Sequence, residues 1–103
     1  MKRQTYSYRH GRRLWPWIWS LYKLKATSTY GVGAARLGVH RRMMGRILGA
    51  IQYEMDQQGR PPYQALVANE ITRLPGKGYV GGGSYKRDLK HIYASRMPKK
   101  PTF

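Results

Sequence analysis

Few side chains in this sequence could perform acid–base or metal chemistry. Its 103 residues include only four acids, Glu54, Asp56, Glu70 and Asp88. Three of these acids, Glu54, Asp56 and Glu70, could be combined with Lys77 into the metal-dependent carboxylate–lysine cluster of a small nuclease or toxin. However, Glu54 and Asp56 stand two residues apart on a predicted helix and therefore point in different directions. We therefore predict that the chain has no catalytic residues and is not an enzyme.

Metal and cofactor chemistry is not indicated either. The sequence contains no cysteine, which excludes disulfides, thiolate zinc sites and cysteine nucleophiles. The three histidines, His10, His40 and His91, are scattered without the spacing of metal ligands. We expect no metal and no cofactor.

The charge balance points to a polyanionic partner. Twenty Lys and Arg residues face the four acids, which gives a net charge of +16. Such an excess destabilises a compact chain by self-repulsion unless negative charge compensates it. Nucleic acid is the expected partner, and we expect no membrane, because the apolar segment 14–24 is too short to span one. No cleavage site of a secretory signal follows this segment, so the expected location is the cytoplasm or nucleoid of a cell, with a virus as one source.

The centre of the sequence predicts a helix-turn-helix. Thr29 is a candidate N-cap for a helix that ends at Gly38, and a second helix follows over residues 40–56. The second helix carries an apolar stripe with helical spacing, formed by Met44, Ile47, Leu48, Ile51 and Met55. The opposite side of this helix carries Arg42, Arg46, Gly49 and Tyr53. An arginine face with glycine gaps suits close approach to a nucleic-acid backbone.

The flanking segments predict one domain with two basic ends. Residues 1–13 are expected to form a basic, flexible arm, and residues 97–103 a basic tail. Between them, residues 14–96 form the predicted domain. Its first helix covers residues 14–24, with Pro16 in the first turn, and the aromatic richness of this segment makes a strand the alternative. We predict that the three tryptophans of this helix pack in the core, and the weaker alternative is that they stack on bases.

The second half of the domain is predicted to be less helical. The glycine and prolines of residues 59–62 end the second helix of the pair, and residues 65–68 form a short strand. Residues 74–83 form a glycine-rich loop or wing. A basic helix then closes the domain over residues 85–96. The expected fold is therefore mainly α with a small β wing, a single winged helix-turn-helix domain.

The predicted DNA interface consists of one tyrosine, one glycine and the cations of these segments. Its members are Tyr30, Arg36, Arg41, Arg42, Gly45, Arg46, Lys77, Lys86 and Arg87. Phosphate contacts made by the basic arm and by Lys77, Lys86, Arg87 and Lys90 would supply most of the affinity, which salt would reduce strongly.

The order of several short motifs resembles the alkylguanine-DNA alkyltransferases, and more closely their non-enzymatic relatives, the alkyltransferase-like proteins. The resemblance covers residues 14–93. It rests on five motifs: Thr29-Tyr30-Gly31, Ala34-Ala35-Arg36-Leu37-Gly38, Arg42-x-x-Gly45-Arg46, Val67-Ala68-Asn69 and Gly78-Tyr79-x-Gly81-Gly82.

The resemblance implies a winged helix-turn-helix that enters the minor groove. By this resemblance, Arg42 takes the place of a nucleotide rotated out of the base stack, and Tyr30 crowds the adjacent phosphate. The segment 69–82 would line the base pocket. The resemblance therefore assigns Tyr63, Gln64, Asn69 and Tyr79 to that pocket.

One segment departs from the enzymes of this family. Their reactive Pro-Cys-His-Arg is matched, to within one residue, by Pro62-Tyr63-Gln64-Ala65. Alkyl transfer requires a thiolate, so this chain cannot perform it. Tyr63 and Gln64 are either contacts to an extruded base or, for Tyr63, simply part of the core.

The sequence thus predicts a non-catalytic protein that grips duplex DNA, with recognition of a damaged base or of duplex shape. An RNA-binding component of a ribonucleoprotein is the alternative, because many tyrosines and basic ends are common to RNA binders. A small basic nuclease or toxin is the third candidate. No feature of the sequence identifies a protein partner.

Overall fold

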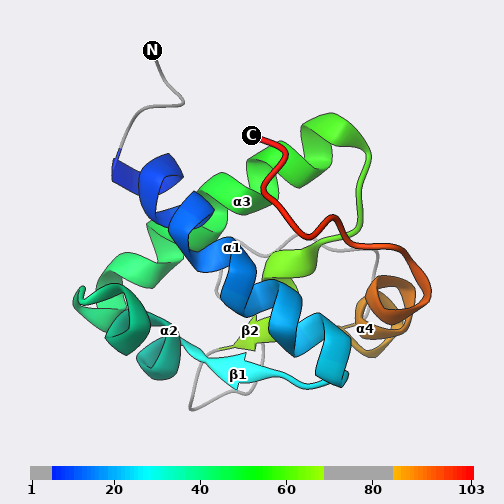
Figure 1. Cartoon of the computed structure of the whole chain (residues 1–103), viewed down its shortest axis with the longest axis horizontal. Helices are drawn as coiled ribbons and strands as arrows, with labels where there is room; N and C mark the ends of the chain where they lie inside the picture. The colour runs from blue at the N-terminus through cyan, green and yellow to red at the C-terminus, as the bar shows by residue number, and fades with distance from the viewer. Residues whose placement is uncertain (1–5, 69–84) are drawn as a thin grey trace.

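The computed structural model describes residues 6–68 and 85–103, and these ranges are mainly helical (Figure 1). The first half contains helix α1 (Tyr6–Leu24), strand β1 (Ser28–Thr29), helix α2 (Tyr30–Leu37), a 3₁₀ turn (Arg41–Met43) and helix α3 (Met44–Gln58). The second half contains a 3₁₀ helix (Tyr63–Leu66), strand β2 (Val67–Ala68) and helix α4 (Tyr85–Ala94). No helix in the described ranges has the length and apolar character needed to cross a membrane.

Helix α1 begins earlier than the sequence predicted. The prediction placed its start at residue 14 and a flexible arm before it, but residues 6–13 are helical. This extension packs on the core, since a methyl group added at buried Gly11 would lie 3.2 Å from Ile51 Cγ1. Pro16 therefore lies inside the helix, not in its first turn. Pro16 has no amide hydrogen to donate, but it is exposed, so water can reach the backbone there.

Helix α2 has the ends that its sequence predicted. The Thr29 side chain accepts a hydrogen bond from the backbone N–H of Val32, which satisfies one amide of the first turn. At the other end Gly38 adopts the left-handed conformation with φ of 73°, which costs little without a Cβ. The tight turn between α2 and α3 follows from this glycine.

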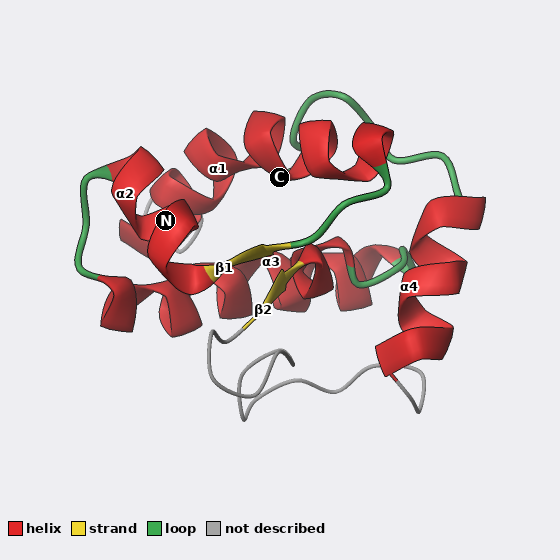
Figure 2. Cartoon of the chain, turned by 90° about the horizontal axis from the view of Figure 1, so that it is seen from below, coloured by secondary structure: helices red, strands yellow, loops and turns green. Residues whose placement is uncertain are grey.

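The core is formed where α1 lies across α3. The predicted apolar stripe of α3 is confirmed, since Met44, Ile47 and Ile51 are fully buried. From α1, Trp15 and Ile18 are also fully buried against this cluster. Figure 2 shows α1 and α3 as two layers, with the short strands beside them.

The sheet consists of two very short parallel strands in the described part of the chain. Ser28 pairs with Val67, and Thr29 pairs with Ala68. The strand predicted over residues 65–68 is thus confirmed only in its second half, because residues 63–66 form a 3₁₀ helix. This parallel pair is not a β-hairpin wing, and the segment predicted as the wing lies outside the described residues.

Tyrosine hydroxyl groups tie α4 and the residues after it to the rest of the domain. Tyr85 donates a hydrogen bond to the carbonyl oxygen of Ala65 at 3.0 Å, and Tyr93 donates one to that of Ala26 at 2.9 Å. The Tyr63 hydroxyl lies 2.9 Å from the Ser95 hydroxyl. Burial raises the pKa of all three tyrosines above the ordinary value.

The C-terminal tail packs on the domain, which the sequence did not predict. Met97 is buried, and the Trp15 indole N–H donates a hydrogen bond to the Pro98 carbonyl oxygen at 2.8 Å. The Phe103 ring lies edge-on to the Trp15 ring, with centroids 5.7 Å apart. Thr102 donates a hydrogen bond to Gln58 on α3. The tail therefore bridges α1 and α3.

Raising the pH above about 10 is expected to destabilise the fold through the buried tyrosines. Because their pKa values are raised in the folded state, the unfolded chain loses these protons first. Their contribution to stability is complete below the unfolded pKa of about 10 and is lost as the pH rises through the folded value. Urea unfolding measures the free energy of unfolding of Tyr93→Phe and the parent across this pH range. This free energy should fall less steeply with pH for the variant, and equal slopes would contradict the raised pKa of Tyr93.

Phe103→Ala is expected to lower the free energy of unfolding by about 1–2 kcal/mol, because it removes a half-buried ring from Trp15. Chemical denaturation measures the change. Lys100→Ala, at an exposed neighbouring position, is the matched control and should be nearly neutral. Equal stabilities of the two variants would mean that the tail does not pack as described.

Candidate nucleic-acid interface

The outward side of α3 presents arginines and glycines to solvent, and exposed Asp56 lies on the same side two turns after Gly49. Arg42, in the 3₁₀ turn, and Arg46, Gly49 and Tyr53, in α3, are all exposed. Tyr53 is 56% exposed, which is unusual for so large an aromatic side chain. The sequence prediction that these four residues share the side opposite the apolar stripe is confirmed.

A 3₁₀ turn ahead of α3 positions two more features of this surface. Arg41 and Arg42 are both exposed on the turn. The His40 imidazole Nδ1 accepts a hydrogen bond from the backbone N–H of Arg42 at 3.2 Å. His40 therefore caps the turn and fixes the backbone of Arg42. Sequence analysis missed this role, because histidine is not among the usual capping residues.

Arg36, at the end of α2, is held by an aromatic ring of α1. Its guanidinium carbon lies 5.8 Å from the centre of the Trp17 ring, within the range of a cation–π interaction. Arg36 is exposed on its other side. Trp17 is thus a positioning residue, a role different from both the core packing and the base stacking that the sequence suggested for it.

Two glycines of α3 leave the surface between the arginines smooth. A methyl group added at Gly45 or Gly49 would meet no heavy atom within 4 Å. Neither glycine is required by the packing, although glycine within a helix costs about 0.5–1 kcal/mol relative to alanine. Gly33 differs, since a methyl group there would lie 2.7 Å from Met44 Cε and 3.1 Å from Trp17. A ligand whose backbone lies close to α3 would explain why glycine stands at positions 45 and 49.

Tyr30 begins α2 and is half-buried against the core. It therefore contributes to packing, while part of its side chain remains accessible at the start of the helix. Two other predicted interface residues lie elsewhere. Lys86 and Arg87 are exposed on α4, at the opposite end of the molecule from α2 (Figures 1 and 2). The structure thus places Arg41, Arg42 and Arg46 on the 3₁₀ turn and the first turn of α3, whereas Arg36 lies on α2 against Trp17 of α1, and Lys86 and Arg87 lie on α4.

Of the residues assigned to the base pocket, Tyr63 belongs to the core. It is only 1% exposed, and its ring lies edge-on to that of Trp15 with centroids 6.0 Å apart. The packing alternative for Tyr63 is therefore the correct one. Gln64 is also buried, with 4% exposure, and neither its amide oxygen nor its amide nitrogen has a hydrogen-bond partner among the described residues. Burying an unpaired amide costs about 1–3 kcal/mol.

Asn69, Lys77 and Tyr79 lie outside the described residues, as does Glu70.

The acids do little to balance the exposed cations. Of the three acids within the described ranges, Glu54 and Asp88 are buried, and only Asp56 is exposed. Glu54 and Asp56 therefore point in different directions, as predicted. Across residues 6–68 and 85–103, no three histidine or acidic side chains form a group that could hold a metal ion. The described surface is accordingly strongly positive.

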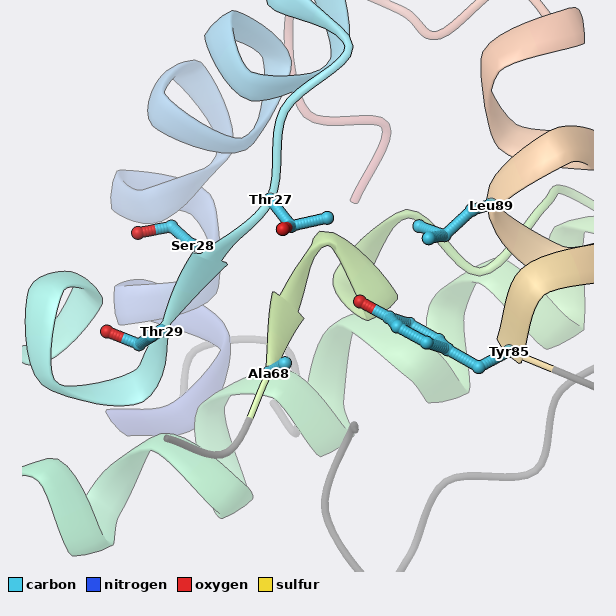
Figure 3. Close-up of a pocket in the computed structure, with 6 residues that line it drawn as sticks. All are labelled: Thr27, Ser28, Thr29, Ala68, Tyr85 and Leu89. Carbon is cyan, nitrogen blue, oxygen red and sulfur yellow. The ribbon is translucent and has the colours of Figure 1, made fainter. Parts of the chain in front are cut away.

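A small pocket of about 160 Å³ lies between the sheet and α4 (Figure 3). Thr27, Ser28 and Thr29 line one side, and Tyr85 and Leu89 of α4 line the other. All of its lining residues are neutral, so the pocket offers no charge to a phosphate. The arginines of the 3₁₀ turn and α3 therefore suit phosphate better than this pocket does.

Comparisons of the chain with known protein families, with characterised proteins and with solved structures return no match. The resemblance to alkyltransferase-like proteins stays a prediction, and the function is argued from the residues of this chain.

Gly49→Ala is expected to raise the free energy of unfolding by about 0.5–1 kcal/mol, because alanine favours the helix and its methyl group meets nothing. Gly33→Ala should not show this gain, since the added methyl group would lie 3.1 Å from the Trp17 ring and would have to displace the end of Met44. Thermal or chemical denaturation of both variants checks the contrast. A destabilised Gly49→Ala variant would mean that the fold itself requires this glycine.

Proposed function

We propose that this chain is a non-catalytic, winged helix-turn-helix protein that binds duplex DNA through the outward face of α3. The observation that carries the proposal is the combination of exposed Arg42 and Arg46 with two glycines that the fold does not need. Arginine contributes charge-assisted hydrogen bonds to phosphate, and glycine allows a backbone to approach closely. On one helix face, arginine and glycine together allow close contact with a phosphate backbone.

The arrangement of α2, the turn and α3 supports this orientation. Gly38 makes the turn tight, and His40 fixes the backbone just before Arg42. An arginine held at the start of the second helix suits insertion at a base step in the minor groove, where arginine is favoured. By the resemblance to alkyltransferase-like proteins, Arg42 would fill the space left by a rotated nucleotide.

By the same resemblance, Gln64 would contact an extruded base. A buried amide whose oxygen and nitrogen both lack partners within the described part of the chain can accept and donate hydrogen bonds. These are the groups needed at the edge of a base. Its unsatisfied state gives a reason to expect recognition of a base and not only of duplex shape.

Arg42→Ala is expected to weaken binding to duplex DNA by about 1–3 kcal/mol at constant salt, because it removes a contact to the DNA. Fluorescence anisotropy with a labelled duplex, a duplex with one alkylated guanine and a structured RNA measures the change. Unaltered affinity for both duplexes would contradict the assignment of Arg42. Tighter binding of the RNA by the parent protein would favour the ribonucleoprotein alternative and contradict the proposal.

Arg60→Ala serves as the matched control for charge, because Arg60 is exposed beyond the end of α3 and its Nε donates only to Gln58. It should reduce affinity much less than Arg42→Ala. The stabilised Gly49→Ala variant provides a second comparison, because there we expect greater stability together with weaker DNA binding. Loss of folding cannot produce that combination.

A further inference from the structure

The outward side of α1 is also basic. Its buried residues include Leu14, Trp15 and Ile18. Successive residues of a helix are about 100° apart, which determines the residues on the opposite side. These are the exposed Arg9, Arg13, Pro16 and Lys23, together with half-buried Arg12. The described part of α1 contains no acid to offset them. The row from Arg9 to Lys23 is about 21 Å long at the usual helical rise.

The tail extends this row of cations at the end of α1. Lys99 Nζ lies 5.4 Å from the centre of the Trp19 ring, and Lys23 Nζ lies 5.6 Å from the same ring. The ring thus holds two lysines from distant parts of the sequence on one surface. We call the set Arg9, Arg12, Arg13, Lys23 and Lys99 the α1 face.

The local potential at the start of the α1 face is positive. The pKa of His10 is lowered, first by burial and then by the charges of Arg13 and Arg9. Arg13 also lies within hydrogen-bond distance of the His10 ring.

The α1 face and the outward face of α3 point in opposite directions. The two helices bury their apolar sides against each other, so their polar sides must face away from each other. Figure 2 shows α1 and α3 as separate layers. The domain measures 24 Å along its shortest axis. This exceeds the Debye length of about 8 Å at physiological ionic strength, so phosphates on opposite faces would hardly repel each other.

We propose that the α1 face is a second DNA-binding surface, and that one molecule bridges two duplex segments. The inference rests on the proposed DNA binding by α3. Arg9 and Arg13 lie about 6 Å apart along α1, and Lys23 lies about 15 Å beyond Arg13. A span of this length reaches several phosphates of a duplex, which carries a charge about every 3.4 Å on each strand. A straight duplex on the α3 face cannot reach the α1 face, so the second surface remains open to a second segment.

Capture of a second duplex tests the proposal. One short duplex is tethered to beads and saturated with protein, the excess protein is washed away, and a fluorescent duplex of the same length is added. We expect the parent protein to retain the fluorescent duplex. The triple variant Arg9→Gln, Arg13→Gln, Lys23→Gln is brought to saturation of the tethered duplex by raising its concentration, and it should then retain about tenfold less of the second duplex than the parent protein does. Glutamine preserves helix formation, and circular dichroism confirms folding.

A charge-matched control separates the α1 face from total charge. Arg60→Gln, Lys90→Gln, Arg96→Gln removes three exposed cations outside both faces and should retain bridging near the parent level. If it loses bridging as much as the α1 triple variant, net charge and not the α1 face is responsible, and the proposal is overturned. Undiminished capture by the α1 triple variant would also overturn it, since bridging would then arise from self-association or another surface.

The same experiment distinguishes this inference from the proposed function. If the parent protein saturates the tethered duplex but retains no second duplex, DNA binding stands and the second face is overturned. If the parent protein does not bind the tethered duplex, the proposed function fails, and the bridging inference fails with it.

Discussion

The packing of α1 across α3 is the contact on which the rest of the structure depends. Gly11 allows the two helices to approach at Ile51, and Trp15 fills the space beside them. Both helices are amphipathic, so this single contact buries their apolar sides and turns their arginines outward in opposite directions. The C-terminal tail then packs on both helices, through Trp15 of α1 and Gln58 of α3.

The same packing explains how so basic a chain can form a compact domain. Placing the cations on opposite sides keeps them apart and in water, where their repulsion is screened. Of the three acids in the described ranges, only Asp56 is exposed, so few negative charges lie among the cations at this surface. An excess of +16 therefore remains available to a polyanion. Phosphates would relieve the remaining repulsion and stabilise the folded state as they bind.

Local patterns in the sequence predicted the elements that depend on neighbouring residues. The stripe of α3 follows from its helical period, and the ends of α2 follow from Thr29 and Gly38. The start of α1 and the packing of the tail were missed because they depend on contacts between distant segments, such as that of Phe103 with Trp15. The helical period of α3 also predicted that its arginines are exposed. The burial of Gln64 was not predictable, since a short 3₁₀ helix has no such period in its sequence.

Amide chemical shifts of the protein during titration with a short duplex test the central claim most directly. The account predicts that Gly45 and Gly49 on the outward face of α3 shift at the lowest DNA concentrations, together with the backbone amide of Arg42. Glycine amides are well suited to this, because no side chain separates their backbone from the ligand. Saturating DNA that leaves these amides unmoved while others shift would place the interface elsewhere and contradict the account.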